Sequence, residues 1–188
     1  MSTLFDLSGK KAIITGSSKG IGKATAIRLA EHGAKVVITS RKIDACEEVA
    51  SEINKTYGAD TAIAIACNIS DKDQLEKLHN DSVAWCGDID TLICNAAINP
   101  YFGPSLNIPD SAFEKIMRSN VQSNFWLSNM VIPNMIKNKS GSIIIISSIA
   151  GLHGSSLLGA YAISKAADSQ LSRNISVEHG PSGIRANC

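Results

Sequence analysis

Two side chains with complementary acid–base chemistry lie one helical turn apart in the last third of the chain. Tyr161 and Lys165 are four residues apart, so on a helix they share one face. A free phenol ionises near pH ~10, which is too high for proton exchange around neutrality. A lysine ammonium held nearby favours the phenolate, so the pair predicts a tyrosine that can exchange protons. The spacing alone is common, and it indicates a site only in combination with other residues.

Ser148 is the first of those other residues. It lies thirteen residues before Tyr161, at the end of a β-branched segment that reads as a buried strand. Ligands of open α/β sheets bind at the carboxyl ends of the strands, so this hydroxyl is expected beside the tyrosine. Ser147 should point to the other face of the strand end.

A glycine-rich turn near the N-terminus joins the first predicted strand directly to a helix. Residues 15–22 read TGSSKGIG. Glycine lets the backbone turn tightly and approach a pyrophosphate, and a helix start supplies unpaired N–H groups and a positive dipole end. A tight loop without a ligand is the alternative. The residues expected to bind a dinucleotide here are Gly16, Ser18, Lys19, Gly20, Ile21 and Gly22.

The residues after the second predicted strand indicate which dinucleotide is bound. A fold that selects NAD usually has a carboxylate there for the ribose hydroxyls. This chain instead has Ser40-Arg41-Lys42, and its first acid is Asp44. Arg41, with Lys42 and with Lys19 approaching from the glycine loop, could pair with a 2′-phosphate. We therefore expect NADP(H) rather than NAD(H), with solvated surface cations as the alternative.

Short β-branched segments alternate with longer helical patterns, which predicts a parallel sheet covered by helices. Gly33 and Gly58 are expected as left-handed caps, and Pro133 should bend or shorten the fourth helix. The predicted strands are 11–15, 35–39, 61–66, 91–94, 142–147 and one that begins at Ile184. The predicted helices are 21–32, 43–57, 72–85, 111–137 and 159–179.

Composition and charge narrow the function classes. The 188 residues are 44% apolar and 19% charged with a formal net charge of +1, which argues against nucleic-acid or membrane-surface partners. The five cysteines are scattered, so neither a disulfide framework nor a metal site is expected. No export signal is visible, and the apolar stretch around 143–146 is too short to span a bilayer. A cytoplasmic location is expected.

As a set, these motifs resemble those of the short-chain dehydrogenases/reductases, in their compact single-domain branch. The resemblance covers essentially the whole chain in the right order. It implies a doubly wound Rossmann fold of about six parallel strands in the order 3-2-1-4-5-6, forming one NADP(H)-binding domain over residues 1–188. The residues that carry it are Gly16, Gly20, Asn95-Ala96-Ala97, Asn120, Ser148, Tyr161 and Lys165.

The resemblance implies four catalytic residues. Tyr161 is the general acid/base, Ser148 hydrogen-bonds the same substrate oxygen, and Lys165 favours the phenolate and holds the nicotinamide ribose. Asn120 would lie in a helix kink and hold a water that links Lys165 to solvent; an ordinary helix-surface amide is the alternative.

The resemblance also adds cofactor contacts. Asn68, with Ile69, follows the third strand where the family commonly has an aspartate that reaches the adenine. Asn95 and Ala96 follow the fourth strand, and Ala97 stands where the family usually has glycine.

The implied activity is reversible interconversion of a carbonyl and a secondary alcohol. Segments 99–102 and 150–158 are apolar or small, which suggests an apolar substrate, and His153 reads as a loop residue. Family members usually continue beyond the sixth strand, where this chain stops at Cys188, into a substrate lid and an edge strand. We therefore expect a weakly active protein or a fragment of a longer enzyme. The alternatives are a silent NADP(H)-binding module and an interaction domain without cofactor.

Helices 111–137 and 159–179 resemble the pair that forms the family's dimer interface. Phe125, Trp126 and Met130 are candidates for its apolar face, although a monomer core would use them equally well. We expect a homodimer rather than a tetramer.

Overall fold

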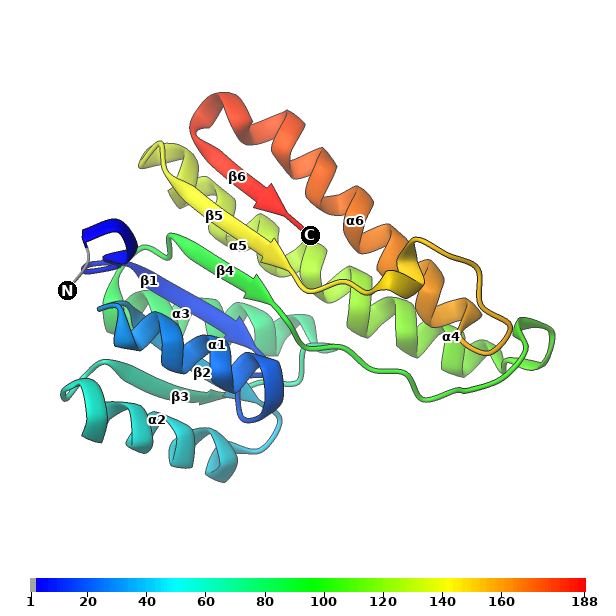
Figure 1. Ribbon diagram of the computed structural model, residues 1–188, viewed down its shortest axis with the longest axis horizontal. Helices are drawn as coiled ribbons and strands as arrows, with labels where there is room; N and C mark the ends of the chain where they lie inside the picture. Colours follow the sequence, from blue (N-terminus) through cyan, green and yellow to red (C-terminus); the bar gives the residue numbers. More distant parts are fainter. Residues whose placement is uncertain (1–2) are drawn as a thin grey trace.

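The computed structural model describes residues 3–188, whose six strands form a parallel sheet with helices on both faces (Figure 1). The strand order is β3-β2-β1-β4-β5-β6, which confirms the predicted doubly wound topology. The strands are β1 (Lys11–Thr15), β2 (Lys35–Ser40), β3 (Ala62–Ala66), β4 (Thr91–Cys94), β5 (Gly141–Ile145) and β6 (Ile184–Asn187).

The middle residues of the central strands are apolar because both faces of the sheet are covered. Ile13 and Ile14 are adjacent in β1 and both fully buried, yet they belong to separate cores. Successive side chains of a strand point to opposite faces, so each face of the sheet has its own layer of helices.

Two helices cover one face and three cover the other. α1 (Gly20–Glu31) and α2 (Ile43–Tyr57) pack on the face of Ile14. α3 (Lys72–Cys86), α5 (Ser123–Lys137) and α6 (Gly159–His179) pack on the face of Ile13. Short 3-10 turns complete the chain: η1 (Thr3–Phe5), η2 (Ser105–Asn107), η4 (Ile149–Gly151) and η5 (Gly180–Ser182).

The helix predicted over 111–137 consists of three segments. α4 (Asp110–Met117) leads into one π-helical turn, η3 (Arg118–Gln122), and then into α5. α5 continues past Pro133 to Lys137, so the proline does not end the helix. Val131 and Met135, on either side of the proline, are buried in the core, so this part of the helix is held by its packing although one backbone hydrogen bond is missing.

The two expected glycine caps differ in conformation. Gly33 follows α1 with a φ of 96°, in the region that favours glycine. Gly58 also has a positive φ, of 118°, but its ψ of 149° is extended rather than left-handed helical. A glycine is required at both places, but only the first fits the predicted cap.

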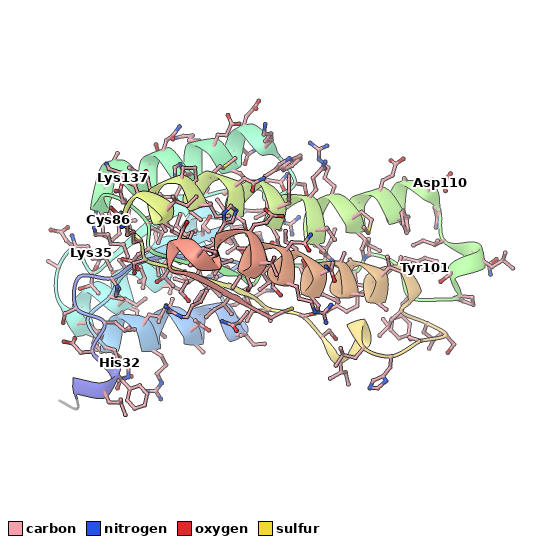
Figure 2. The ribbon with its side chains drawn as sticks, turned by 90° about the horizontal axis from the view of Figure 1, so that it is seen from above. His32, Lys35, Cys86, Tyr101, Asp110 and Lys137 are labelled. Carbon is pink, nitrogen blue, oxygen red and sulfur yellow. The ribbon has the colours of Figure 1, made fainter. Side chains whose placement is uncertain are left out.

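The molecule is elongated because α4 and the loop before it extend beyond the sheet. Tyr101 and Asp110 lie together at one end, and Lys35 and Cys86 lie at the other (Figure 2). The carboxyl ends of the strands point toward the α4 end (Figure 1). Within residues 3–188, no helix combines the length and apolar character needed to cross a bilayer.

His79 on α3 links stability to pH. Burial lowers the pKa of its imidazole from 6.5, and within residues 3–188 its buried Nε2 atom has no hydrogen-bond partner. The folded state therefore disfavours the charged form, and the unfolded chain binds the proton more readily. Because the folded pKa is the lower one, stability falls as pH falls through 6.5.

Replacing this histidine should flatten that dependence. We expect the free energy of unfolding in urea to drop less between pH 7.5 and pH 5.5 in His79→Gln than in the unchanged protein. His153→Gln, at an exposed loop position, should retain the original dependence. Equal slopes for His79→Gln and the unchanged protein would contradict the assignment.

Candidate active site

A cleft of about 630 Å³ opens at the carboxyl ends of β1 to β4. Segments that follow these four strands form most of its wall, and residues of α4 and η3 close one side. Nine of the residues predicted to bind the cofactor line it: Gly16, Ser18, Lys19, Gly20, Arg41, Asn68, Ile69, Asn95 and Ala96.

Five other residues of the predicted cofactor set lie outside the lining, namely Ile21, Gly22, Lys42 and the two catalytic candidates Tyr161 and Lys165. Ile21 is exposed on α1, and Lys42 is the exposed residue before α2. Gly22 is buried beneath the loop. A Cβ atom there would lie 2.5 Å from the Gly16 carbonyl oxygen and 2.6 Å from Asn95 Nδ2. Gly22 therefore allows close packing of α1 against the loop.

The start of α1 faces this cleft with its N–H groups available. Gly16 and Gly20 have φ values of 68° and 57°, which glycine adopts without strain. Lys19 precedes the helix, and its side chain makes no capping hydrogen bond within the described part of the chain. Unpaired N–H groups and the positive end of the helix dipole fit a pyrophosphate.

Ser17 ties the glycine loop to β2. Its hydroxyl donates to the Ile14 carbonyl at 2.7 Å and accepts from the Thr39 N–H at 2.8 Å. Ser17 is fully buried, so these bonds replace its hydration. The sequence analysis assigned it no role, and its only signal was its place inside the glycine motif.

Asn95 braces the same loop from β4. Its Nδ2 atom donates to the Thr15 carbonyl at 2.8 Å and to the Gly16 carbonyl at 3.2 Å. The Thr15 hydroxyl in turn accepts from the N–H groups of Asn95 and Ala96, both at 3.0 Å. The loop is thus held in shape by residues far away in sequence.

The cleft is lined by cations. Arg41 and Lys19 were predicted, whereas Lys115 and Arg118 were missed because they come from α4 and η3. Arg118 Nε donates to the Ser70 carbonyl at 2.6 Å. No carboxylate occurs among the described lining residues, so the cleft suits an anionic ligand.

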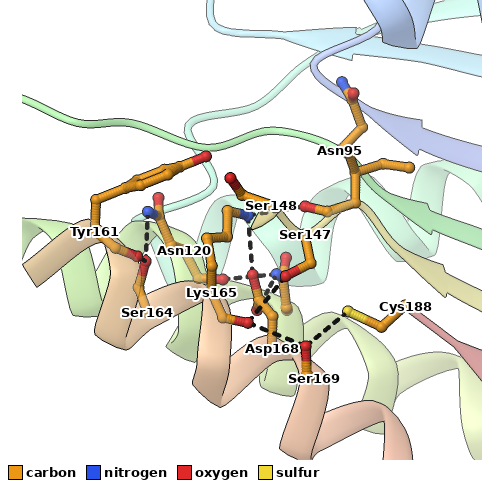
Figure 3. Close-up of polar contacts among 12 residues, drawn as sticks. Asn95, Asn120, Ser147, Ser148, Tyr161, Ser164, Lys165, Asp168, Ser169 and Cys188 are labelled. Atoms are coloured by element: carbon orange, nitrogen blue, oxygen red, sulfur yellow. Dashed lines mark hydrogen bonds and ion pairs between the residues drawn. The ribbon is translucent and has the colours of Figure 1, made fainter. Parts of the chain in front are cut away.

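Three of the four predicted catalytic side chains, those of Tyr161, Lys165 and Ser148, come together beside this cleft (Figure 3). The Lys165 Nζ atom lies 5.9 Å from the centroid of the Tyr161 ring. Ser148 follows β5 and its hydroxyl accepts from the Ala150 N–H at 3.1 Å. Ser147 instead donates to the Lys165 carbonyl at 3.0 Å, so the two serines have different partners.

Lys165 is almost completely excluded from water. Its Nζ atom donates to the Ile146 carbonyl and to Asp168 Oδ2, both at 2.9 Å. Asp168 is fully buried and accepts from Asn124 Nδ2 at 2.9 Å. Burial raises the pKa of the Asp168 carboxyl, while Lys165 and Asn124 oppose that rise. The sequence analysis missed Asp168 because three-residue spacing to a lysine occurs on many helices.

Asn120 lies in the π-helical turn and is fully buried, which excludes an ordinary surface amide. Its Oδ1 atom accepts from the Ile98 N–H at 2.8 Å. Its Nδ2 atom donates to the Ile98 carbonyl and to Ser164 Oγ, both at 3.0 Å. Asn120 therefore fastens the loop after β4 to α6.

The fold is that of a Rossmann-type α/β protein, with a cation-lined cleft at the carboxyl ends of its strands. A family model described as short chain dehydrogenase matches residues 10–188. The chain therefore belongs to the short-chain dehydrogenase/reductase family, whose members are oxidoreductases that use a nicotinamide cofactor.

Curated relatives agree with this assignment. Dehydrogenase/reductase SDR family member 4 of Bos taurus is 37% identical over 182 residues, which cover 97% of this chain and 64% of that protein. Dehydrogenase/reductase SDR family member 2, mitochondrial, of Homo sapiens is 37% identical over 183 residues, with the same coverage of 97% and 64%. The chain thus spans about 64% of the length of these relatives.

Solved structures share the fold. A short-chain type dehydrogenase/reductase from Mycobacterium marinum superimposes with a TM-score of 0.90 and 36% identity, covering 98% of this chain and 72% of that one. A 7α-hydroxysteroid dehydrogenase complexed with NADH and 7-oxo glycochenodeoxycholic acid gives 0.91 and 38%, covering 96% and 69%.

The contacts around Gly22 predict the effect of a single methyl group there. Gly22→Ala should separate α1 from Gly16 and Asn95, lower the free energy of unfolding by about 1–3 kcal/mol, and weaken nicotinamide cofactor binding. Urea denaturation and fluorescence titration with NADPH and NADH measure the two effects.

Gly180→Ala is the matched control. A Cβ atom there meets nothing within 4 Å in the described part of the chain, and the φ of −54° suits alanine. Unchanged cofactor binding in Gly22→Ala would show that the loop does not depend on this close packing.

Proposed function

We propose that the protein is an NADP(H)-dependent oxidoreductase that interconverts a carbonyl group and a secondary alcohol. The observation that carries this proposal is the convergence of Tyr161, Ser148 and the buried Lys165 beside a cation-lined cleft. An acid–base residue, a hydroxyl donor and a fixed cation are the groups that carbonyl reduction requires from a protein.

Each side chain has a defined part in the proposed reaction. During reduction, the Tyr161 hydroxyl gives its proton to the carbonyl oxygen, and Ser148 donates a hydrogen bond to that same oxygen. The Lys165 ammonium stabilises the negative charge that Tyr161 then carries. In the reverse direction, the phenolate removes the proton of the alcohol. When bound, the nicotinamide supplies or accepts the hydride.

The residues that line the cleft support NADP(H) as the cofactor. The N–H groups at the start of α1 would hold the pyrophosphate, and Arg41 would pair with a 2′-phosphate. Lys19 lines the same cleft, and Lys42 lies just outside it. Asn68 and Ile69 would contact the adenine from the end of β3.

The segments expected to contact substrate lie close together. Gly103 pairs with Leu158 in an isolated bridge, and the Gly103 N–H donates to the Leu157 carbonyl at 2.9 Å. Phe102 is 68% exposed beside this bridge. The exposed apolar side chains of these segments, such as Phe102 and Leu157, support an apolar ketone, aldehyde or secondary alcohol as substrate.

A homodimer is part of the same proposal. A hollow of about 810 Å³ lies over α4, η3 and α5, and Phe125, which lines it, is 48% exposed. Trp126 and Met130 pack against the core instead, so of the three candidates only Phe125 supports an apolar docking face.

The five free cysteines favour a reducing compartment, and we propose the cytoplasm as the location of the protein.

Removing one hydroxyl tests the acid–base assignment. With a panel of apolar ketones and aldehydes, Tyr161→Phe should lower the rate of NADPH oxidation about 10²- to 10⁴-fold, because the hydroxyl proposed to transfer the proton is removed. The affinity for NADPH, measured by fluorescence, should stay within about threefold of the original value, since the pyrophosphate contacts are intact.

Tyr57→Phe is the matched control, because Tyr57 is the last residue of α2 and belongs neither to the cleft lining nor to the segments expected to contact substrate. It should retain the original rate. Full activity in Tyr161→Phe would refute the role of Tyr161, and NADPH binding without turnover in the unchanged protein would favour the silent module.

The cofactor preference has its own test. Arg41→Ala should weaken NADPH binding about 10- to 100-fold relative to NADH, because one charge-assisted pair is lost. Arg173→Ala, at an exposed position on α6, should leave the ratio of the two affinities unchanged. An unchanged ratio in Arg41→Ala would mean that another residue selects the cofactor.

A further inference from the structure

A buried carboxylate next to Lys165 has no part in the proposed chemistry so far. We propose that Asp168 is a positioning residue that keeps Lys165 charged and directs its remaining N–H toward Tyr161. This inference deepens the proposed function and rests on it. Asp168 and Lys165 lie three residues apart on α6, and their side chains are 0% and 3% exposed.

The geometry fixes the direction of the ammonium group. An ammonium has three N–H donors, and two of them are used by the Ile146 carbonyl and Asp168 Oδ2. The two acceptors come from different elements, the end of β5 and α6 itself. Within residues 3–188 one donor remains, and Nζ lies 5.9 Å from the centroid of the Tyr161 ring.

The contacts of Asp168 fit an ionised carboxylate. Its Oδ2 atom accepts from Lys165, and its Oδ1 atom accepts from Asn124 Nδ2 at 2.9 Å. The same Asn124 amide donates to the Asn120 carbonyl at 2.6 Å, so both of its N–H groups are used. Each carboxylate oxygen therefore faces a donor, which leaves no acceptor for a carboxylic proton among these partners.

Few other charges of the described residues lie around Lys165. Within residues 3–188, the ionisable side chains that interact with it are Asp168 and Tyr161 on α6 and Cys94 on β4, and burial keeps the Cys94 thiol protonated by raising its pKa. From η3, Arg118 binds the Ser70 carbonyl and stacks over Trp126. The α5 and η3 groups that complete this network, Asn124 and Asn120, are neutral amides.

Charge balance decides what Asp168 does. A nearly dry ammonium without a counter-charge loses its proton far more easily than one beside a carboxylate. Asp168 also weakens the field of Lys165 at Tyr161, but it touches Nζ directly and the interaction decreases with distance. The dominant effect is therefore to hold the proton on Lys165, and with it the cation that favours the phenolate.

A purely structural role is the competing explanation, because Asn124 and Asp168 also join α5 to α6. Two variants separate the roles. Asp168→Asn removes the charge and keeps the shape, whereas Asn124→Ala breaks the same link between helices and keeps the charge.

The readout is the titration of the Lys165 side chain by NMR of protein labelled at the lysine Cε carbon, with Lys165→Arg identifying the resonance. We expect the midpoint in Asp168→Asn to fall by about one pH unit or more. In Asn124→Ala it should stay within about half a unit of the original value. An unmoved midpoint in Asp168→Asn, or an equal fall in both variants, would overturn the proposal.

The unchanged protein provides a test that does not depend on folding of a variant. At pH 7 the Asp168 Cγ resonance should be that of a carboxylate and the Lys165 Cε resonance that of an ammonium. A protonated Asp168 at that pH would overturn the proposal. None of these readouts involves turnover, so they can fail while Tyr161→Phe still abolishes activity, and the reverse.

Discussion

An ammonium group buried beside a phenol is the constraint on which this structure depends. Lys165 is 2% exposed, and removing an unpartnered charge from water to that extent is very costly. The fold supplies its partners from the end of β5, from α6 and, through Asn124, from α5. Breaking a buried pair of this kind typically costs about 3–5 kcal/mol, so the site and the packing of the helices stabilise one another.

The cleft is also held in shape by residues that lie far apart in the sequence. Ser17 ties the glycine loop to β2, Asn95 ties it to β4, and Gly22 lets α1 approach closely. Asn120 fastens the loop after β4 to α6, which carries Tyr161 and Lys165. The carboxyl ends of the parallel strands all lie on the same side of the sheet, so the loops that follow these strands come together there.

Much of the fold could be predicted from the sequence, because local pattern encodes it. The buried strands and the glycine turn are set by side-chain hydrophobicity and backbone freedom within a few residues. No comparable local sequence pattern predicts the π-helical turn at Arg118–Gln122. None predicts that α5 continues beyond Pro133 either. Asn124 and Arg118 were missed because their partners lie on other elements. Asp168 was missed because a carboxylate three residues from a lysine occurs on many ordinary helices.

The central claim is that Lys165 makes Tyr161 easier to ionise. The chain has three tyrosines, so ultraviolet absorbance of tyrosinate, recorded as the difference between the protein and Tyr161→Phe, follows Tyr161 alone. With NADP⁺ present, this signal should reach half its final value at a lower pH in the unchanged protein than in Lys165→Met. The same half-ionisation pH in both proteins would contradict the account.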